Sequence, residues 1–137
     1  MGIDYGSKRI GIAVSDEEGE IAFPYLVLPN NSSLITEITQ VCDDEKVGGI
    51  VIGESLDSSG EPNKIMESIK EFESLLEKVV DLPIYFEKEF MTSVYSDIQK
   101  DKNIFSARKT KKESHRKDDS KAAALILQRF LDRENKK

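Results

Sequence analysis

The chain has 137 residues, of which 34% are charged and 38% hydrophobic, and its formal net charge is −6. This length and composition predict one soluble globular domain, and the acidic balance argues against a protein that coats nucleic acid with a basic surface. No apolar run approaches the roughly 18 residues that a membrane-spanning helix needs, so we expect no membrane association. The single cysteine, Cys42, excludes an internal disulfide and fits the reducing cytoplasm, where we expect the protein to act.

The first part of the chain predicts three short strands, over residues 3–5, 10–14 and 21–25. The turn-like sequences GSKR and EEGE separate them, and consecutive strands at this spacing favour an antiparallel meander. Pro24 lies inside the third strand, which is typical of a strand at the edge of a sheet.

From residue 33 onward, helical spacing alternates with short apolar runs. Helices are predicted over residues 34–42 and 62–80, because apolar residues recur there every three or four positions. The runs 47–53 and 84–86 are apolar without alternation, as in parallel strands that are buried on both faces.

The end of the chain predicts a short helix from Thr92, a mobile loop over about 101–117 and a closing helix over 118–133 that Asp118 or Asp119 caps. The resulting order of elements predicts an α/β fold. We expect a mixed five-stranded sheet, with three antiparallel strands followed by parallel strands and with helices on both faces. We expect residues 1–137 to form a single domain.

Three acids lie where such a sheet would bring its elements together. Asp4 is in the first, central strand, Glu89 follows the strand over 84–86, and Asp119 is at the start of the last helix. Carboxylates around one point favour Mg²⁺ or Mn²⁺ over zinc, and these ions can catalyse phosphodiester hydrolysis. A helix cap at Asp119 and a solvated loop acid at Glu89 are the alternatives. Asp4 is harder to explain without a cation or hydrogen-bond donors, because it interrupts an apolar strand.

Two groups of cations are candidates for contacts with nucleic acid. Lys8 and Arg9 lie at the first turn, where an ordinary solvated hairpin is the alternative. The segment 106–117 carries six cations and one acid, so it could grip a polyanion on an otherwise acidic protein. A solubilising charge run is the alternative for this segment. Its candidate residues are Arg108, Lys109, Lys111, Lys112, Arg116 and Lys117.

Four sequence motifs resemble those of a known family. GIDYGSKRIGIAVSD, at residues 2–16, closely resembles the opening of the YqgF/RuvX family of Holliday junction resolvase-like proteins, which have an RNase H-like fold. The later stretches IVIGESLDSSGEPN, KEFMTSV and DDSKAAALILQRFL resemble the family's remaining motifs in the same order. The resemblance therefore covers nearly the whole chain.

The resemblance implies a metal-dependent endonuclease that acts on structured nucleic acid, either pre-rRNA or branched DNA. Its role would be 5′-end processing of pre-16S rRNA, in ribosome biogenesis, or Holliday junction resolution. Carried over by position, the family's catalytic and metal-binding acids fall on Asp4, Glu89 and Asp119. Either a monomer or a homodimer is expected, and two symmetric cuts in a junction would need two sites.

The sequence departs from the family pattern at three places. Lys88 stands where the family usually has Asp, and Phe90 where it usually has Arg. Met1 directly precedes Gly2, so the first strand lacks the few extra residues that the family normally has. These departures leave open a non-catalytic rRNA-binding factor for ribosome assembly. A sugar-kinase-like ATPase is disfavoured, because 137 residues leave no room for its second lobe.

Overall fold

The computed structural model describes residues 1–56, 59–90 and 111–136, and for residues 89, 90 and 111–118 it describes the backbone only. The described part contains five strands and three helices. They are β1 (Gly2–Tyr5), β2 (Arg9–Ser15), β3 (Ala22–Pro29), α1 (Leu34–Asp44), β4 (Ile50–Leu56), α2 (Met66–Glu77), β5 (Ile84–Phe90) and α4 (Lys111–Asn135).

The five strands form one mixed sheet in the order β3-β2-β1-β4-β5. β1 is the central strand, antiparallel to β2 and parallel to β4, and β5 continues the parallel half. The predicted α/β class and the mixed five-stranded sheet of the RNase H-like fold are therefore confirmed. The central place of β1 means that Asp4 lies in the middle of the sheet rather than at an edge.

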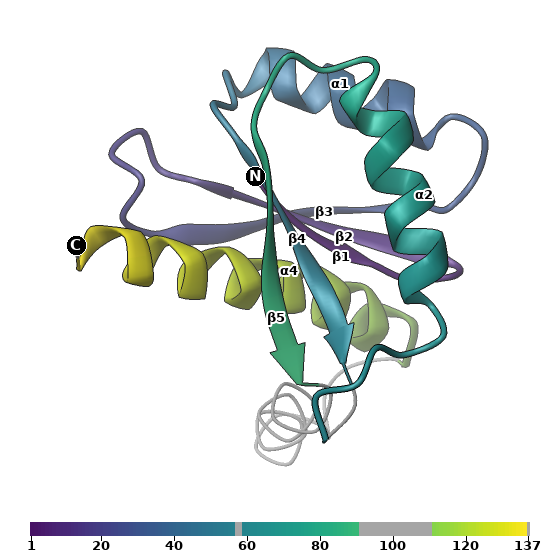
Figure 1. Ribbon diagram of the computed structural model, residues 1–137. Helices are drawn as coiled ribbons and strands as arrows, with labels where there is room; N and C mark the ends of the chain where they lie inside the picture. Colours follow the sequence, from purple (N-terminus) through teal and green to yellow (C-terminus); the bar gives the residue numbers. More distant parts are fainter. Residues whose placement is uncertain (57–58, 91–110, 137) are drawn as a thin grey trace.

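Helices cover both faces of this sheet, as predicted. Figure 1 shows α1 and α2 together on one face and α4 running across the other. The larger core cluster lies beneath α1 and α2 and is rich in isoleucine from the strands, and it includes the predicted buried thiol of Cys42. The smaller cluster lies beneath α4. Its buried members are Ala13, Val51, Ala123, Ile126 and Leu127.

Two glycines let α4 approach the sheet closely. A Cβ atom at Gly11 would lie 1.9 Å from the Asp119 carbonyl oxygen, and a Cβ atom at Gly2 would lie 2.6 Å from the Ala123 carbonyl oxygen. Both distances are far below van der Waals contact, so only glycine allows the helix backbone to rest directly on β1 and β2. Gly2 lies in the same strand as Asp4, and Gly11 lies opposite Asp4 in the neighbouring strand β2.

Several predicted boundaries are wrong by a few residues. β4 covers 50–56 instead of 47–53, and β3 covers 22–29 instead of 21–25. β3 is longer because its last residues pair with β2 beyond an irregularity at Ile12/Ala13, which a simple alternation pattern does not register. α2 begins at Met66 rather than at Pro62, because Pro62 forms an isolated bridge with Leu56.

The last helix is the largest correction. α4 begins at Lys111, so residues 111–117 are helical and not part of a loop, and neither Asp118 nor Asp119 caps it. The segment lacks apolar periodicity, but Lys, Glu and Arg are good helix formers, and a helix already held by packing extends at little cost. The predicted helix from Thr92 and the rest of the predicted loop, 101–110, lie outside the described residues. Within the described residues, no helix combines the length and apolarity that crossing a membrane requires.

Candidate metal and nucleic-acid site

Asp4 is a partly buried acid in the centre of the sheet, opposite Gly11 of β2. Burial, and after it the nearby Asp119 carboxylate, raise the pKa of its carboxyl group from 3.8 to about 7. An acid in this state holds its proton near neutral pH unless a positive charge comes close. Asp4 is therefore costly as a purely structural residue, and it is suited to binding a cation.

Asp119 comes to the same place from the opposite layer. It is the ninth residue of α4, so the predicted alternative of a helix N-cap does not hold. Its Oδ2 atom is shielded from solvent, and the Nε atom of Arg9 lies 3.0 Å away from it. The close contact of α4 with Gly11 fixes the helix backbone at this point. The fold thus brings together two of the three predicted acids.

The third predicted acid, Glu89, lies within β5 and not just past a strand. Its backbone pairs with Ser55 of the neighbouring strand β4, and the position of its carboxylate is outside what the structure describes. Among the side chains that the structure does describe, no group of three metal-binding residues is gathered. Lys88, the departure from the family pattern, is exposed. The described site is therefore a pair of carboxylates from β1 and α4.

The predicted cations divide into three groups. Lys8 is exposed in the turn between β1 and β2, whereas Arg9 begins β2 and pairs with Asp119. Arg108 and Lys109 lie outside the described residues. The remaining four belong to the first turns of α4, where only the backbone is described; they are Lys111, Lys112, Arg116 and Lys117.

Two contacts that the sequence analysis did not identify hold α4 against the sheet. The Gln128 side chain accepts a hydrogen bond from the Ala22 backbone N–H (2.8 Å) and donates one to the Glu20 carbonyl oxygen (2.8 Å). The buried carboxylate of Glu87 in β5 pairs with Arg133 Nη1 at 2.6 Å. Glu87 directly follows the predicted apolar run 84–86, and the sequence pattern does not indicate that its carboxylate is buried.

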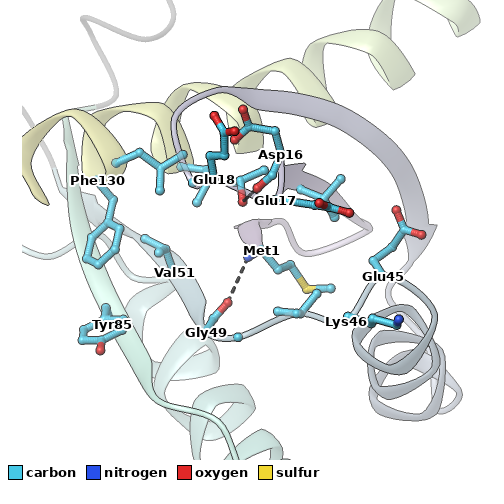
Figure 2. Close-up of a pocket in the computed structure, with 17 residues that line it drawn as sticks. Met1, Asp16, Glu17, Glu18, Glu45, Lys46, Gly49, Val51, Tyr85 and Phe130 are labelled. Atoms are coloured by element: carbon cyan, nitrogen blue, oxygen red, sulfur yellow. Dashed lines mark hydrogen bonds between the residues drawn. The ribbon is translucent and has the colours of Figure 1, made fainter. Parts of the chain in front are cut away.

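A cavity of about 540 Å³ lies away from the carboxylate pair. Figure 2 shows Met1 in it, with its ammonium group donating a hydrogen bond to the Gly49 carbonyl oxygen at 2.9 Å. Apolar side chains such as Phe130 form one side and glutamates of the turn after β2 form another. None of the predicted site residues lines this cavity. Charge and geometry, not size, therefore identify the carboxylate pair as the candidate site.

The donor set at the carboxylate pair fits a hard divalent cation. Carboxylate oxygens are the ligands that Mg²⁺ and Mn²⁺ prefer, and the two acids come close enough to raise the pKa of one of them. A divalent cation would offset both their repulsion and the burial of Asp4. The chemistry of the residues present therefore fits the metal that the sequence predicts.

This chain is similar to known proteins over nearly its full length. Residues 1–133 match the model of a family described as "RuvX: Holliday junction resolvase". A protein of Maridesulfovibrio salexigens is 36% identical over 135 residues, and the match covers 97% of both chains. A protein of Rickettsia felis is 35% identical over 135 residues, which cover 96% of this chain and 84% of the relative. Both relatives carry the name "Putative pre-16S rRNA nuclease".

Proposed function

Because this chain belongs to the RuvX family, we propose that it is a nuclease that hydrolyses phosphodiester bonds of structured nucleic acid with the help of Mg²⁺ or Mn²⁺. The observation that carries the proposal is the convergence of Asp4 and Asp119 from opposite layers of the fold. Asp4 is an acid in a central strand with a raised pKa, and Asp119, which is too far inside α4 to cap it, lies close enough to contribute to that shift.

We assign Asp4, Asp119 and Glu89 to the metal. When bound, the ion activates water for attack on phosphorus and stabilises the leaving oxygen. Asp4 contributes by giving up its proton to become a ligand, which its pKa of about 7 allows near neutral pH. Asp119 contributes a carboxylate on a rigid helix that is packed against Gly11. Glu89 completes the set from β5.

Nucleic acid would approach the carboxylate pair by contacting cations that lie near Arg9 and Asp119 in the sequence. Lys8 is exposed and directly precedes Arg9, which pairs with Asp119, and the cations of residues 108–117 precede Asp119 in the sequence. Phosphate contacts of this kind are independent of base sequence and sensitive to salt. Phe90 replaces an arginine of the family pattern, so one phosphate contact of the family is absent here and the remaining cations carry more of the binding.

The names of the relatives favour precursor rRNA as the substrate, and we propose 5′-end processing of pre-16S rRNA in the cytoplasm as the role of this chain. Branched DNA is the other substrate that the family description suggests. A junction resolvase would act as a homodimer, since two symmetric cuts need two sites. Light scattering with and without substrate distinguishes that arrangement from a monomer.

The test incubates the purified protein with labelled pre-16S rRNA, single-stranded RNA or a four-way DNA junction, each in Mg²⁺, Mn²⁺ or EDTA. We expect cleavage of the precursor that requires metal and is lost in the variants Asp4→Asn and Asp119→Asn. Asp81→Asn is the matched control, because Asp81 is an exposed acid at the other end of β5. Salt-sensitive RNA binding without any metal-dependent product would refute the nuclease and favour the ribosome-assembly factor. Cleavage that survives Asp4→Asn would refute the assigned site.

A further inference from the structure

Arg9 was predicted as a contact for nucleic acid, with an ordinary solvated hairpin as the alternative. Arg9 is the first residue of β2, and its Nε atom lies 3.0 Å from Oδ2 of Asp119. The side chain of Arg9 is 43% exposed and that of Asp119 is 29% exposed. The pair therefore lies at the rim of the candidate site, where one side of the guanidinium faces the acid and another part reaches solvent.

Backbone packing fixes this pair more firmly than its exposure suggests. Gly11, two residues after Arg9, is in contact with the backbone of Asp119 and lies opposite Asp4 in the sheet. The three charged residues are thus attached to one rigid junction of β1, β2 and α4. The ion pair directs the charge of Arg9 at Asp119.

An arginine in this place opposes the binding of a divalent cation to the same oxygen. Arginine side chains are not deprotonated in proteins, so a guanidinium gives way to another cation only by moving. A metal ion bound by Asp119 would have to displace the guanidinium or share the carboxylate with it. Either event leaves a positive group at the rim of the site, beside the place where a scissile phosphate would bind.

We propose that Arg9 is a positioning residue that competes with the divalent cation for Asp119 and turns toward the substrate phosphate when the cation binds. The proposal rests on the function proposed above. It makes Arg9 a determinant of metal affinity: the residue orients Asp119 in the absence of added metal, weakens metal binding, and links metal binding to the capture of nucleic acid.

The test measures Mn²⁺ affinity by isothermal titration calorimetry for the unmodified protein, Arg9→Gln and Arg129→Gln. We expect Arg9→Gln to bind Mn²⁺ roughly three- to tenfold more tightly, because a cation next to the ligand oxygen is removed. Arg129→Gln makes the same change in net charge farther along α4 and should leave the affinity unchanged. Arg9→Gln should also bind RNA more weakly in the presence of Mn²⁺, with a smaller salt dependence.

A second measurement does not depend on how well Arg9→Gln folds. The Nε–H NMR signal of Arg9, assigned with Arg9→Lys, should shift when Mg²⁺ is added to the unmodified protein. If the unmodified protein binds no Mn²⁺, the proposed function itself fails. If it binds Mn²⁺ but Arg9→Gln binds with equal or lower affinity, or the Arg9 signal does not move, the nuclease proposal stands and the role of Arg9 is overturned.

Discussion

Replacing Asp4 by asparagine should stabilise the protein while removing its function. The pKa of Asp4 rises from an ordinary value of 3.8 to about 7, first because of burial and then because of Asp119. At about 1.4 kcal/mol per pKa unit, ionised Asp4 costs the fold on the order of 4 kcal/mol, which is an upper limit for the gain in Asp4→Asn. The asparagine side chain has nearly the same shape and carries no charge, so it avoids this cost.

The pH dependence of this gain follows from the sign of the shift. Between pH 4 and pH 7 the folded protein binds a proton at Asp4 that the unfolded chain has lost, so its stability falls as the pH rises through this range. Asp4→Asn lacks this dependence. The two proteins should therefore have similar free energies of unfolding near pH 4.5 and diverge toward pH 8, with the variant more stable.

Urea unfolding in EDTA, monitored by circular dichroism at pH 4.5, 6, 7 and 8, measures this difference. Asp16→Asn is a control of opposite sign, because backbone amides of Glu20 and Ile21 donate to Asp16 and lower its pKa. That variant should be less stable than the unmodified protein at pH 8, and its deficit should shrink in acid. Two results would contradict this account: Asp4→Asn is not more stable at pH 8, or its gain in free energy of unfolding is the same at pH 4.5. In either case, burial does not make ionised Asp4 unfavourable.

Three further outcomes are expected. Gly11→Ala should lower the free energy of unfolding in urea by about 2–3 kcal/mol and weaken Mg²⁺ binding, because its Cβ atom would overlap the Asp119 carbonyl. Gly48→Ala is the control: a Cβ atom there would have no atom within 4 Å, so neither stability nor Mg²⁺ binding should change. Apparent Mg²⁺ affinity should rise with pH up to about 7 as Asp4 loses its proton. Calorimetry in buffers of different ionisation enthalpy should detect the released proton. An Mg²⁺ affinity that does not change with pH would argue against Asp4 as a ligand. Gln128→Ala should lower the free energy of unfolding by about 1 kcal/mol, because its hydrogen bonds to β3 and to the preceding turn are lost; an unchanged midpoint would show that water replaces them.

The sequence was sufficient to predict the sheet because its strands carry strong local signals. The apolar runs around Asp4 and over residues 47–53 led to the central and parallel strands, and the glycines at 2 and 11 allow the helix to cover them closely. The boundaries were less predictable. Pairing with a neighbour extends β3 and moves β4, and such pairing depends on residues that are distant in the sequence.

Of the three acids that the sequence singled out, Asp4 and Asp119 come together in the fold, but their contacts were not predictable. Asp4 stood out because a carboxylate in an apolar strand is costly to bury without a partner. In the structure its pKa is raised by burial and by the nearby Asp119. The ion pair of Arg9 with Asp119 depends on how α4 crosses β2, and periodicity carries no information about that crossing. The start of α4 was also missed, since a charged helix that continues beyond its packed region shows no apolar stripe.

Gln128 couples the turn before β3 to the helix α4. Its side chain fastens the glutamate-rich turn before β3 to the same helix that carries Asp119, nine residues earlier. A helix of 25 residues is a rod about 38 Å long, and it transmits a tilt at one end to the other. A partner that binds this turn would therefore shift the Asp119 carboxylate through α4, without contacting it.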